Sequence, residues 1–149
     1  MTGWISSLVG ALLGVASVTS AFAADLGPAA PAYRVVPGKA ASGACADPSV
    51  LSTIVTRFDY TAANALRSDI AIVEIRDMHL RRAQRKDKLH LVGRQWCGAA
   101  ALTSDGVVRP MWYLIESDWA FAGTGSKTEY CLLGLDPGYV YGAHCASLQ

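Results

Sequence analysis

The sequence LHLVGRQWCGAAALTSDGVVRPMWYLIE, residues 89–116, decides the fold class because it predicts two β-strands joined by a tight turn. Both halves, 89–102 and 107–116, are rich in the apolar and aromatic side chains that favour strands. Between them, residues 103–106 (TSDG) contain an Asp-Gly pair, which is a strong signal for a hairpin turn. We therefore expect an antiparallel hairpin at the centre of the fold.

One further strand is expected on each side of this hairpin, at residues 69–76 before it and at residues 127–135 after it. Their spacing along the chain is typical of an antiparallel meander of four strands. Between the first two strands, residues 78–88 are polar and basic, and this composition predicts either a loop or a short helix.

A helix is expected before the sheet, over residues 48–65. Asp47 precedes Pro48, the typical order of an N-cap acid and a proline in the first turn, and apolar residues then recur at helical spacing. This order of elements predicts an α+β fold in which one N-terminal helix packs on a four-stranded antiparallel meander sheet. Cystatin-like and NTF2-like domains share this layer arrangement, which hosts unrelated functions.

The N-terminal residues 1–24 predict a signal peptide. They contain no charged side chain, carry an apolar run from Trp4 to Phe22 and end in a small-residue cleavage site around Ala23. The alternative is an uncleaved membrane anchor, because the apolar run is long enough to span a bilayer. Residues 25–44, dominated by Ala, Pro and Gly, predict a flexible lead-in, and residues 45–149 have the size of a single domain.

All four cysteines follow the expected signal peptide, and an even number in an exported chain predicts disulfides. We predict the pairs Cys45–Cys97 and Cys131–Cys145, although four cysteines allow three connectivities. The first pair would clip the start of the helix onto the sheet. The second would fold the tail back across the Asp-Pro-Gly turn at 136–138. The expected location is therefore periplasmic or secreted.

Apolar residues fill the strand at 111–115 without alternation, so both faces of the sheet need a cover. If Cys97 faces the helix, alternation predicts an aromatic surface on the opposite face, made of Arg94, Trp96, Trp112, Leu114, Tyr130 and Leu132. Such a surface would bind a protein partner or a second copy of the chain. The alternative is that the C-terminal tail, with Tyr139, Val140 and Tyr141, packs over it.

A dense cluster of positive charge lies in residues 81–88, where five cations stand against Asp87: Arg81, Arg82, Arg85, Lys86 and Lys88. This basic patch predicts an adaptor to anionic surfaces. Nucleic acid is a poor candidate for an exported protein, so the anions would be lipid headgroups, polysaccharide or an acidic protein. The alternative is a solvated loop whose charge protects a sheet edge.

Catalytic chemistry has one candidate, a carboxylate pair formed if Glu116 and Glu129 face each other across neighbouring strands. That pair would suit a small cell-envelope hydrolase using an acid such as Glu116. The sequence has no hydrolase, metalloprotease or nucleotide-binding motif, and its three histidines share no ligand spacing. We therefore expect a non-enzymatic binding domain that uses the aromatic face, without metal or cofactor.

A resemblance to known proteins begins at Arg94 and covers about a third of the chain. It rests on Arg94, Trp96-Cys97-Gly98-Ala99, Asp105-Gly106, Tyr113-Leu114-Ile115-Glu116, Phe121-Ala122-Gly123, Gly125, Glu129, Cys131, Gly134, Asp136, Val140-Tyr141-Gly142 and Cys145. In these residues the chain resembles an uncharacterised family of small exported proteins of alphaproteobacteria. The resemblance implies export and disulfides, and it implies no activity.

Overall fold

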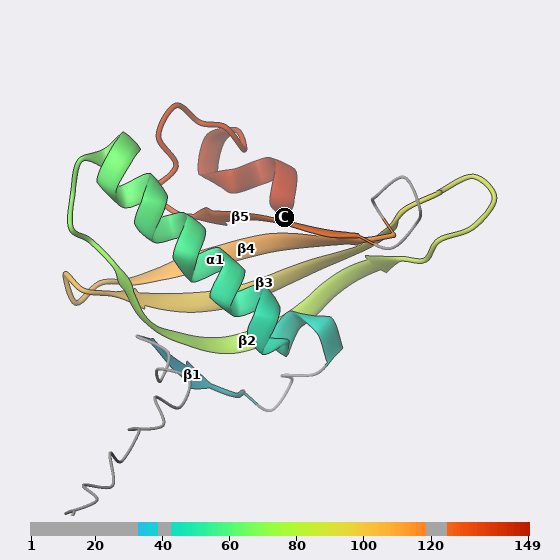
Figure 1. Ribbon diagram of the computed structural model, residues 1–149, viewed down its shortest axis with the longest axis horizontal. Helices are drawn as coiled ribbons and strands as arrows, with labels where there is room; N and C mark the ends of the chain where they lie inside the picture. Colours follow the sequence, from blue (N-terminus) through green and yellow to red (C-terminus); the bar gives the residue numbers. More distant parts are fainter. Residues whose placement is uncertain (1–32, 39–42, 119–124) are drawn as a thin grey trace, which may run out of the picture.

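A five-stranded mixed sheet, covered on one face by a single main helix, forms the body of the molecule (Figure 1). The computed structural model describes residues 33–38, 43–118 and 125–149. The strands lie in sequence order: β1 (Arg34–Val36), β2 (Ile72–Gln84), β3 (Gly93–Thr103), β4 (Val108–Ser117) and β5 (Ser126–Leu132). β1 runs parallel to β2, and the other neighbours are antiparallel. The α+β class is confirmed, whereas the prediction of four antiparallel strands is wrong.

The additional strand, β1, comes from the segment 25–44 that composition assigned to a flexible lead-in. It pairs with β2 in the register Arg34↔Glu74 to Val36↔Arg76. Three exposed residues are too few to show a period-two pattern, so no signal for this strand is present in the sequence. The signal peptide predicted at residues 1–24 lies outside the described residues.

The helix α1 (Pro48–Thr61) begins where the sequence predicts, after the N-cap Asp47. The Asp47 carboxylate accepts a hydrogen bond from the backbone N–H of Ser49 at 2.8 Å. A π-helical turn, η2 (Ala62–Leu66), continues the helix and ends at Arg67 in the left-handed conformation. Four apolar residues at helical spacing face the sheet: Leu51, Ile54, Val55 and Phe58.

The strand β2 extends well beyond its predicted end at residue 76, and β3 starts later than its predicted start at residue 89. The expected connection at 78–88 is therefore strand as far as Gln84, followed by a turn at 85–92. Register shifts between Arg76 and His79 and between Leu80 and Arg82 break the alternation along β2. This end of the hairpin projects beyond the helix as a two-stranded arm (Figure 1), so no core imposed an apolar pattern on it.

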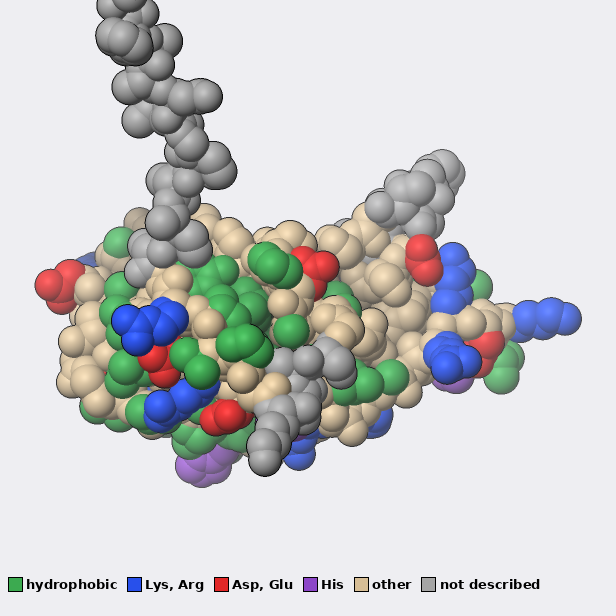
Figure 2. Space-filling view, turned by 90° about the horizontal axis from the view of Figure 1, so that it is seen from below, with side chains coloured by type: hydrophobic (Ala, Val, Ile, Leu, Met, Phe, Trp, Pro, Cys, Tyr) green, Lys and Arg blue, Asp and Glu red, His purple; other side chains and the backbone are tan. Residues whose placement is uncertain are grey.

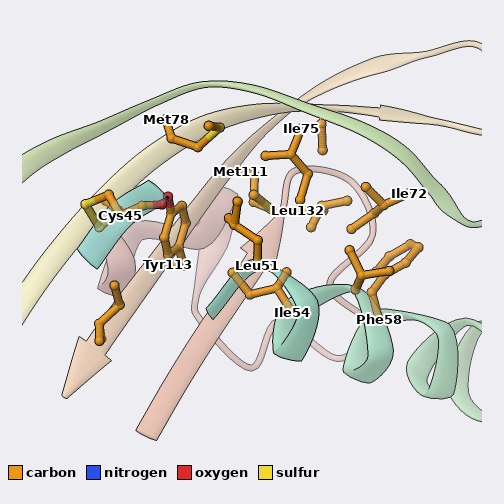
Figure 3. Packing of buried hydrophobic residues seen from close by; sticks show 14 of the residues in the cluster. Cys45, Leu51, Ile54, Phe58, Ile72, Ile75, Met78, Met111, Tyr113 and Leu132 are labelled. Atoms are coloured by element: carbon orange, nitrogen blue, oxygen red, sulfur yellow. Dashed lines mark hydrogen bonds between the residues drawn. A yellow bond between two sulfur atoms is a disulfide. The ribbon is translucent and has the colours of Figure 1, made fainter. Parts of the chain in front are cut away.

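The main hydrophobic core lies between α1 and the sheet (Figure 3). The disulfide Cys45–Cys97 joins a short 3₁₀ helix, η1 (Gly43–Ala46), to β3, as predicted. Beside it, the Tyr113 hydroxyl donates a hydrogen bond to the Cys45 carbonyl oxygen at 2.5 Å. Burial raises the pKa of this hydroxyl, so Tyr113 remains a donor and holds η1 against the sheet.

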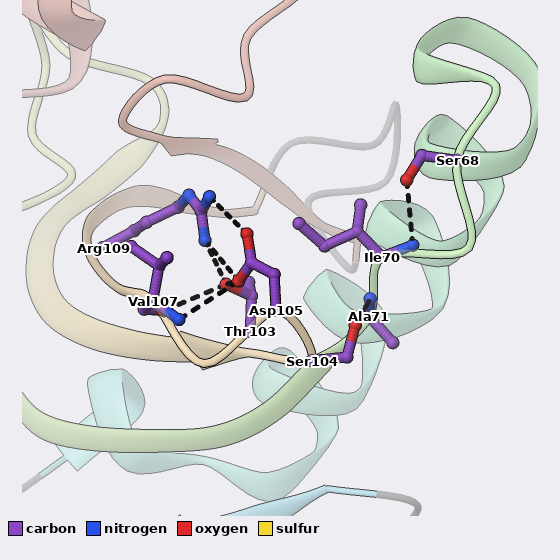
Figure 4. Close-up of polar contacts among 8 residues, drawn as sticks. All are labelled: Ser68, Ile70, Ala71, Thr103, Ser104, Asp105, Val107 and Arg109. Carbon is purple, nitrogen blue, oxygen red and sulfur yellow. Dashed lines mark hydrogen bonds and ion pairs between the residues drawn. The ribbon is translucent and has the colours of Figure 1, made fainter.

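The β3–β4 turn is the Asp-Gly hairpin turn that the sequence predicts. Gly106 takes a positive φ of 80°, and its N–H donates to the Thr103 carbonyl oxygen at 2.9 Å. The Arg109 guanidinium binds both oxygens of the Asp105 carboxylate, at 2.9 and 2.7 Å (Figure 4). These bonds, together with one from the Thr103 hydroxyl, hold the pKa of Asp105 well below its usual range. The carboxylate stays ionised and fixes the turn.

Candidate functional site

The strand register decides which side chains share the sheet face opposite α1. Cys97, Tyr113 and Tyr130 lie opposite one another on three neighbouring strands and face the helix. The next row, Trp96 with Leu114, therefore lies on the other face. The structure places Arg94, Trp96, Trp112 and Leu114 on that opposite face.

Two residues of the predicted aromatic surface are on the wrong face. Leu132 is 1% exposed within the main core, and Tyr130 packs against the same core. β5 pairs with β4 in the register Met111↔Leu132, one residue away from the pairing that the prediction required. A one-residue shift moves every side chain of a strand to the other face. Since β4 ends at Ser117 and β5 begins at Ser126, the connection is too long for a two-residue hairpin signal to set the register in advance.

The C-terminal tail covers part of the opposite face. The disulfide Cys131–Cys145, predicted from the sequence, ties β5 to the short helix η3 (Ala143–Leu148), which lies beside β5 in Figure 1. Around it a second cluster forms from Cys131, Cys145, Leu148, Trp112, Leu114 and Tyr141. The other two tail residues expected there, Tyr139 and Val140, are instead 73% and 72% exposed.

Removing this second disulfide should loosen the tail. With Cys131 and Cys145 both changed to Ala, we expect the free energy of unfolding to fall by about 3 kcal/mol, the chain-entropy value for a loop of about 14 residues. Urea unfolding measures that loss. Quenching of tryptophan fluorescence by iodide should also increase, because Trp112 loses its cover. Unchanged quenching would show that the tail stays in place without its covalent bond.

The Trp96 ring, on the same face, is shielded by a cation. The Arg82 guanidinium stacks over the Trp96 ring, 3.7 Å from its centroid, and Trp96 is only 8% exposed. Such a stack combines a cation–π attraction with burial of the ring. The Trp96 ring therefore offers little uncovered apolar surface to a partner, whereas Val108, which lies on the same face opposite Leu102, is 45% exposed.

Two ion pairs lie on the same face, near the end of β4 and the start of β5. Arg94 Nε lies 2.8 Å from Glu116 Oε1, and Lys127 Nζ lies 2.6 Å from Glu129 Oε1. The hydrogen bond to Glu129 raises the pKa of Lys127. The predicted carboxylate pair is wrong, because Glu116 lies opposite Lys127 in the register and Glu129 lies opposite Leu114.

The arm of the β2–β3 hairpin carries all five residues of the predicted basic patch, and all five are exposed: Arg81, Arg82, Arg85, Lys86 and Lys88. Arg82 is engaged with Trp96, and Lys86 lies 3.8 Å from Asp118. The other three cations form no ion pair with any residue that the structure describes. Figure 2 shows Lys and Arg side chains gathered at the end of the arm, with apolar side chains beside them.

The sequence predicts Leu89 and Leu91 at the start of a strand over residues 89–102, and Leu80 in the polar connection at 78–88. Leu89 and Leu91 lie instead in the turn, and their exposed fractions are 88% and 71%. Leu80, on β2, is 47% exposed. Among the described residues, Leu89 has the highest exposure of any large hydrophobic side chain. The sequence offered no signal that these leucines are exposed, because Leu89-His90-Leu91 also fits the start of a half-buried strand.

Hydrogen bonds fix the turn at the tip of the arm. The Asp87 carboxylate accepts the backbone N–H groups of Leu89 and His90 at 2.8 and 2.7 Å, and the Asp87 N–H donates to the His90 carbonyl oxygen at 2.9 Å. Hydrogen bonds from the His90 side chain, and then from the two N–H groups, lower the pKa of Asp87. The tip is therefore a defined turn that presents Leu89 to solvent.

Comparison with known proteins gives no match. No family model, curated protein or solved structure is similar to this chain. The geometry of the molecule itself therefore carries the functional argument.

Other parts of the described chain offer less chemistry. A groove of about 320 Å³ lies between α1, β5 and the tail. Its polar groups already bond to protein atoms: Arg57 donates to the Thr128 carbonyl oxygen, and the Tyr130 hydroxyl lies 3.3 Å from the Thr61 hydroxyl. Within the ranges that the structure covers, no three His, Cys, Asp or Glu side chains cluster as metal ligands. No helix in those ranges is long and apolar enough to cross a bilayer.

Proposed function

We propose that the chain is an exported interaction domain that docks on an anionic surface through its basic arm, acting by binding and not by catalysis. The observation that carries this proposal is the concentration of exposed cations on one projecting element. The whole chain has 13 basic and 12 acidic residues, a net charge of +1, yet residues 81–88 hold five cations and one anion. Such an asymmetry creates a local positive field that attracts polyanions.

An exported location supports this function. The two buried disulfides are typical of an oxidising, extracellular-type environment. The charge-free apolar run at the N-terminus and the resemblance to small exported alphaproteobacterial proteins both favour the periplasm or the cell exterior. There the available polyanions are lipid headgroups, acidic polysaccharides and acidic proteins.

The test is a charge-removal variant, Arg81→Ser, Arg85→Ser and Lys88→Ser together. Each cation near an anionic surface contributes about 1 kcal/mol, so we expect binding to weaken by about 100-fold. Binding is measured by co-sedimentation with vesicles of 30% phosphatidylglycerol in phosphatidylethanolamine and by retention on dextran sulfate beads, each over a range of salt concentrations. The variant should keep its melting temperature, because exposed charges contribute little stability.

The matched control removes three cations outside the arm, with Arg34→Ser, Arg67→Ser and Arg76→Ser. This control has the same net charge as the arm variant, and we expect it to bind within about threefold of the wild type. The proposal is wrong if the wild-type domain binds neither surface at low salt, or if both variants weaken binding equally.

A second candidate is a protein partner, or a second copy of the chain, on the sheet face opposite α1. It is favoured by the strip formed by the Arg82–Trp96 stack and the Arg94–Glu116 ion pair, because Trp and Arg are enriched in interface hot spots. We rank it second because the tail covers Trp112 and Leu114. Arg94→Ala would weaken this association and leave vesicle and polyanion binding unchanged.

A further inference from the structure

We propose that the arm is a membrane anchor whose tip inserts Leu89 and Leu91 into the interface of an anionic phospholipid bilayer while the surrounding cations contact the headgroups. This inference rests on the proposed function and specifies its partner. It would place the domain on a membrane surface with the helix and the core outside the lipid. The argument has three parts: exposure, charge and the geometry of the tip.

Exposure makes the apolar side chains of the tip available, and the charge around them distinguishes the tip from the exposed Tyr139 and Val140 of the tail. A single exposed apolar residue needs no explanation, because most protein surfaces contain some. Here two leucines, 88% and 71% exposed, stand two residues apart in a turn that makes no contribution to either hydrophobic cluster. The stability of the fold therefore gives no reason for leucine at these positions, whereas insertion into an apolar phase does.

The charge around the leucines indicates which apolar phase they would enter. Lys86 and Lys88 lie within three residues of Leu89, and Arg85 immediately precedes Lys86. Apolar side chains framed by Lys and Arg are the pattern of segments that lie in the membrane interface, where lipid phosphates attract the cations and acyl chains receive the apolar groups. A polysaccharide supplies the anions but no apolar phase, so the leucines would remain in water.

The geometry of the tip lowers the cost of insertion. Backbone N–H groups are costly to remove from water unless they are hydrogen-bonded. At Leu89 and His90 these groups already donate to the Asp87 carboxylate, and the Asp87 N–H donates to the His90 carbonyl oxygen. The turn can therefore enter the headgroup region with these bonds intact.

The experiment compares two matched variants of the full mature domain on the same phosphatidylglycerol vesicles. Leu89→Ser with Leu91→Ser removes the apolar tip, and Tyr139→Ser with Val140→Ser removes two equally exposed apolar side chains from the tail. Partial burial of two leucines is expected to strengthen binding by about 30-fold, so the tip variant should lose that factor while its dependence on salt stays the same. The tail variant should bind as the wild type does.

A spectroscopic measurement reports insertion directly. In a Leu89→Trp variant, the added fluorescence should shift to shorter wavelength on vesicles and be quenched by lipids brominated on the acyl chains. Neither effect should occur with dextran sulfate. Because Leu89 lies outside both clusters, this variant keeps the fold.

The outcomes separate this inference from the proposed function. If the tip variant binds vesicles as tightly as the wild type and the added tryptophan is not quenched, insertion is wrong, while a salt-sensitive loss in the charge-removal variant would leave the anionic-surface function standing. Binding to dextran sulfate without binding to vesicles would also overturn the membrane-anchor inference, and it would leave the proposed binding to a polyanion standing. Failure of the wild type on both surfaces would overturn both proposals.

Discussion

Replacing Cys45 and Cys97 together with Ala is expected to lower the free energy of unfolding by about 4 kcal/mol, the chain-entropy value for a loop of about 52 residues. The two cysteines are 1% and 0% exposed, so their bond joins η1 to β3 inside the core. It also holds the Cys45 carbonyl oxygen at the Tyr113 hydroxyl. A domain of this size has a total stability of about 5–15 kcal/mol, so this loss would be a large share of it.

The comparison that checks this expectation is urea unfolding of both double variants side by side, with the other disulfide intact in each. The loop closed by Cys131 and Cys145 is shorter, 14 residues against 52, so its removal should cost less. The reverse order, or equal losses, would mean that contacts of the tail outweigh the constraint on the unfolded chain.

Where the sequence predicts the fold correctly, the signals are local and chemically specific. The N-cap Asp47 sets the start of α1, and the Asp-Gly pair at 105–106 sets the central hairpin. The disulfide pairing followed from the same local signals, because the turn at 136–138 brings the last two cysteines together and leaves Cys45 for Cys97. Each of these features depends on a few neighbouring residues.

Where the prediction fails, the deciding interaction is distant in the sequence. The strand β1 forms because Arg34–Val36 pairs with the edge of β2, which lies about 40 residues further along the chain. The face of the sheet on which Tyr130 and Leu132 lie depends on the register between β4 and β5. The first of these strands ends at Ser117 and the second begins at Ser126, so no two-residue turn in the sequence sets that register. Apolar residues fill positions 111–115 of β4 without alternation, so the sequence pattern does not say which set of side chains faces the helix.

The candidate site shows the same division. The basic patch is visible as composition, and the structure adds that it lies on a projecting arm. The two leucines at its tip could not be recognised from sequence, because a helix or a third strand over the arm would have buried them. Their importance appears only once the turn at 85–92 is seen to lie beyond the core.

Phe58→Ala is expected to lower the free energy of unfolding by about 3–5 kcal/mol, the usual range for removing a buried aromatic side chain. Phe58 is 1% exposed and lies near Ile72 on the sheet, where its ring fills the space between α1 and β2 (Figure 3). Alanine would leave a cavity in the main core, where Phe58 packs among other buried apolar side chains.

The matched control is Tyr60→Ala, an aromatic residue on the same helix that is 71% exposed. Phe and Tyr have nearly equal helix propensities, so the difference between the two variants isolates burial. We expect Tyr60→Ala to change the free energy of unfolding by no more than about 0.5 kcal/mol, the usual range for surface positions. Urea unfolding followed by circular dichroism measures both variants. Similar losses in the two would mean that α1 is not held against the sheet by its apolar face, which would contradict the arrangement of the core.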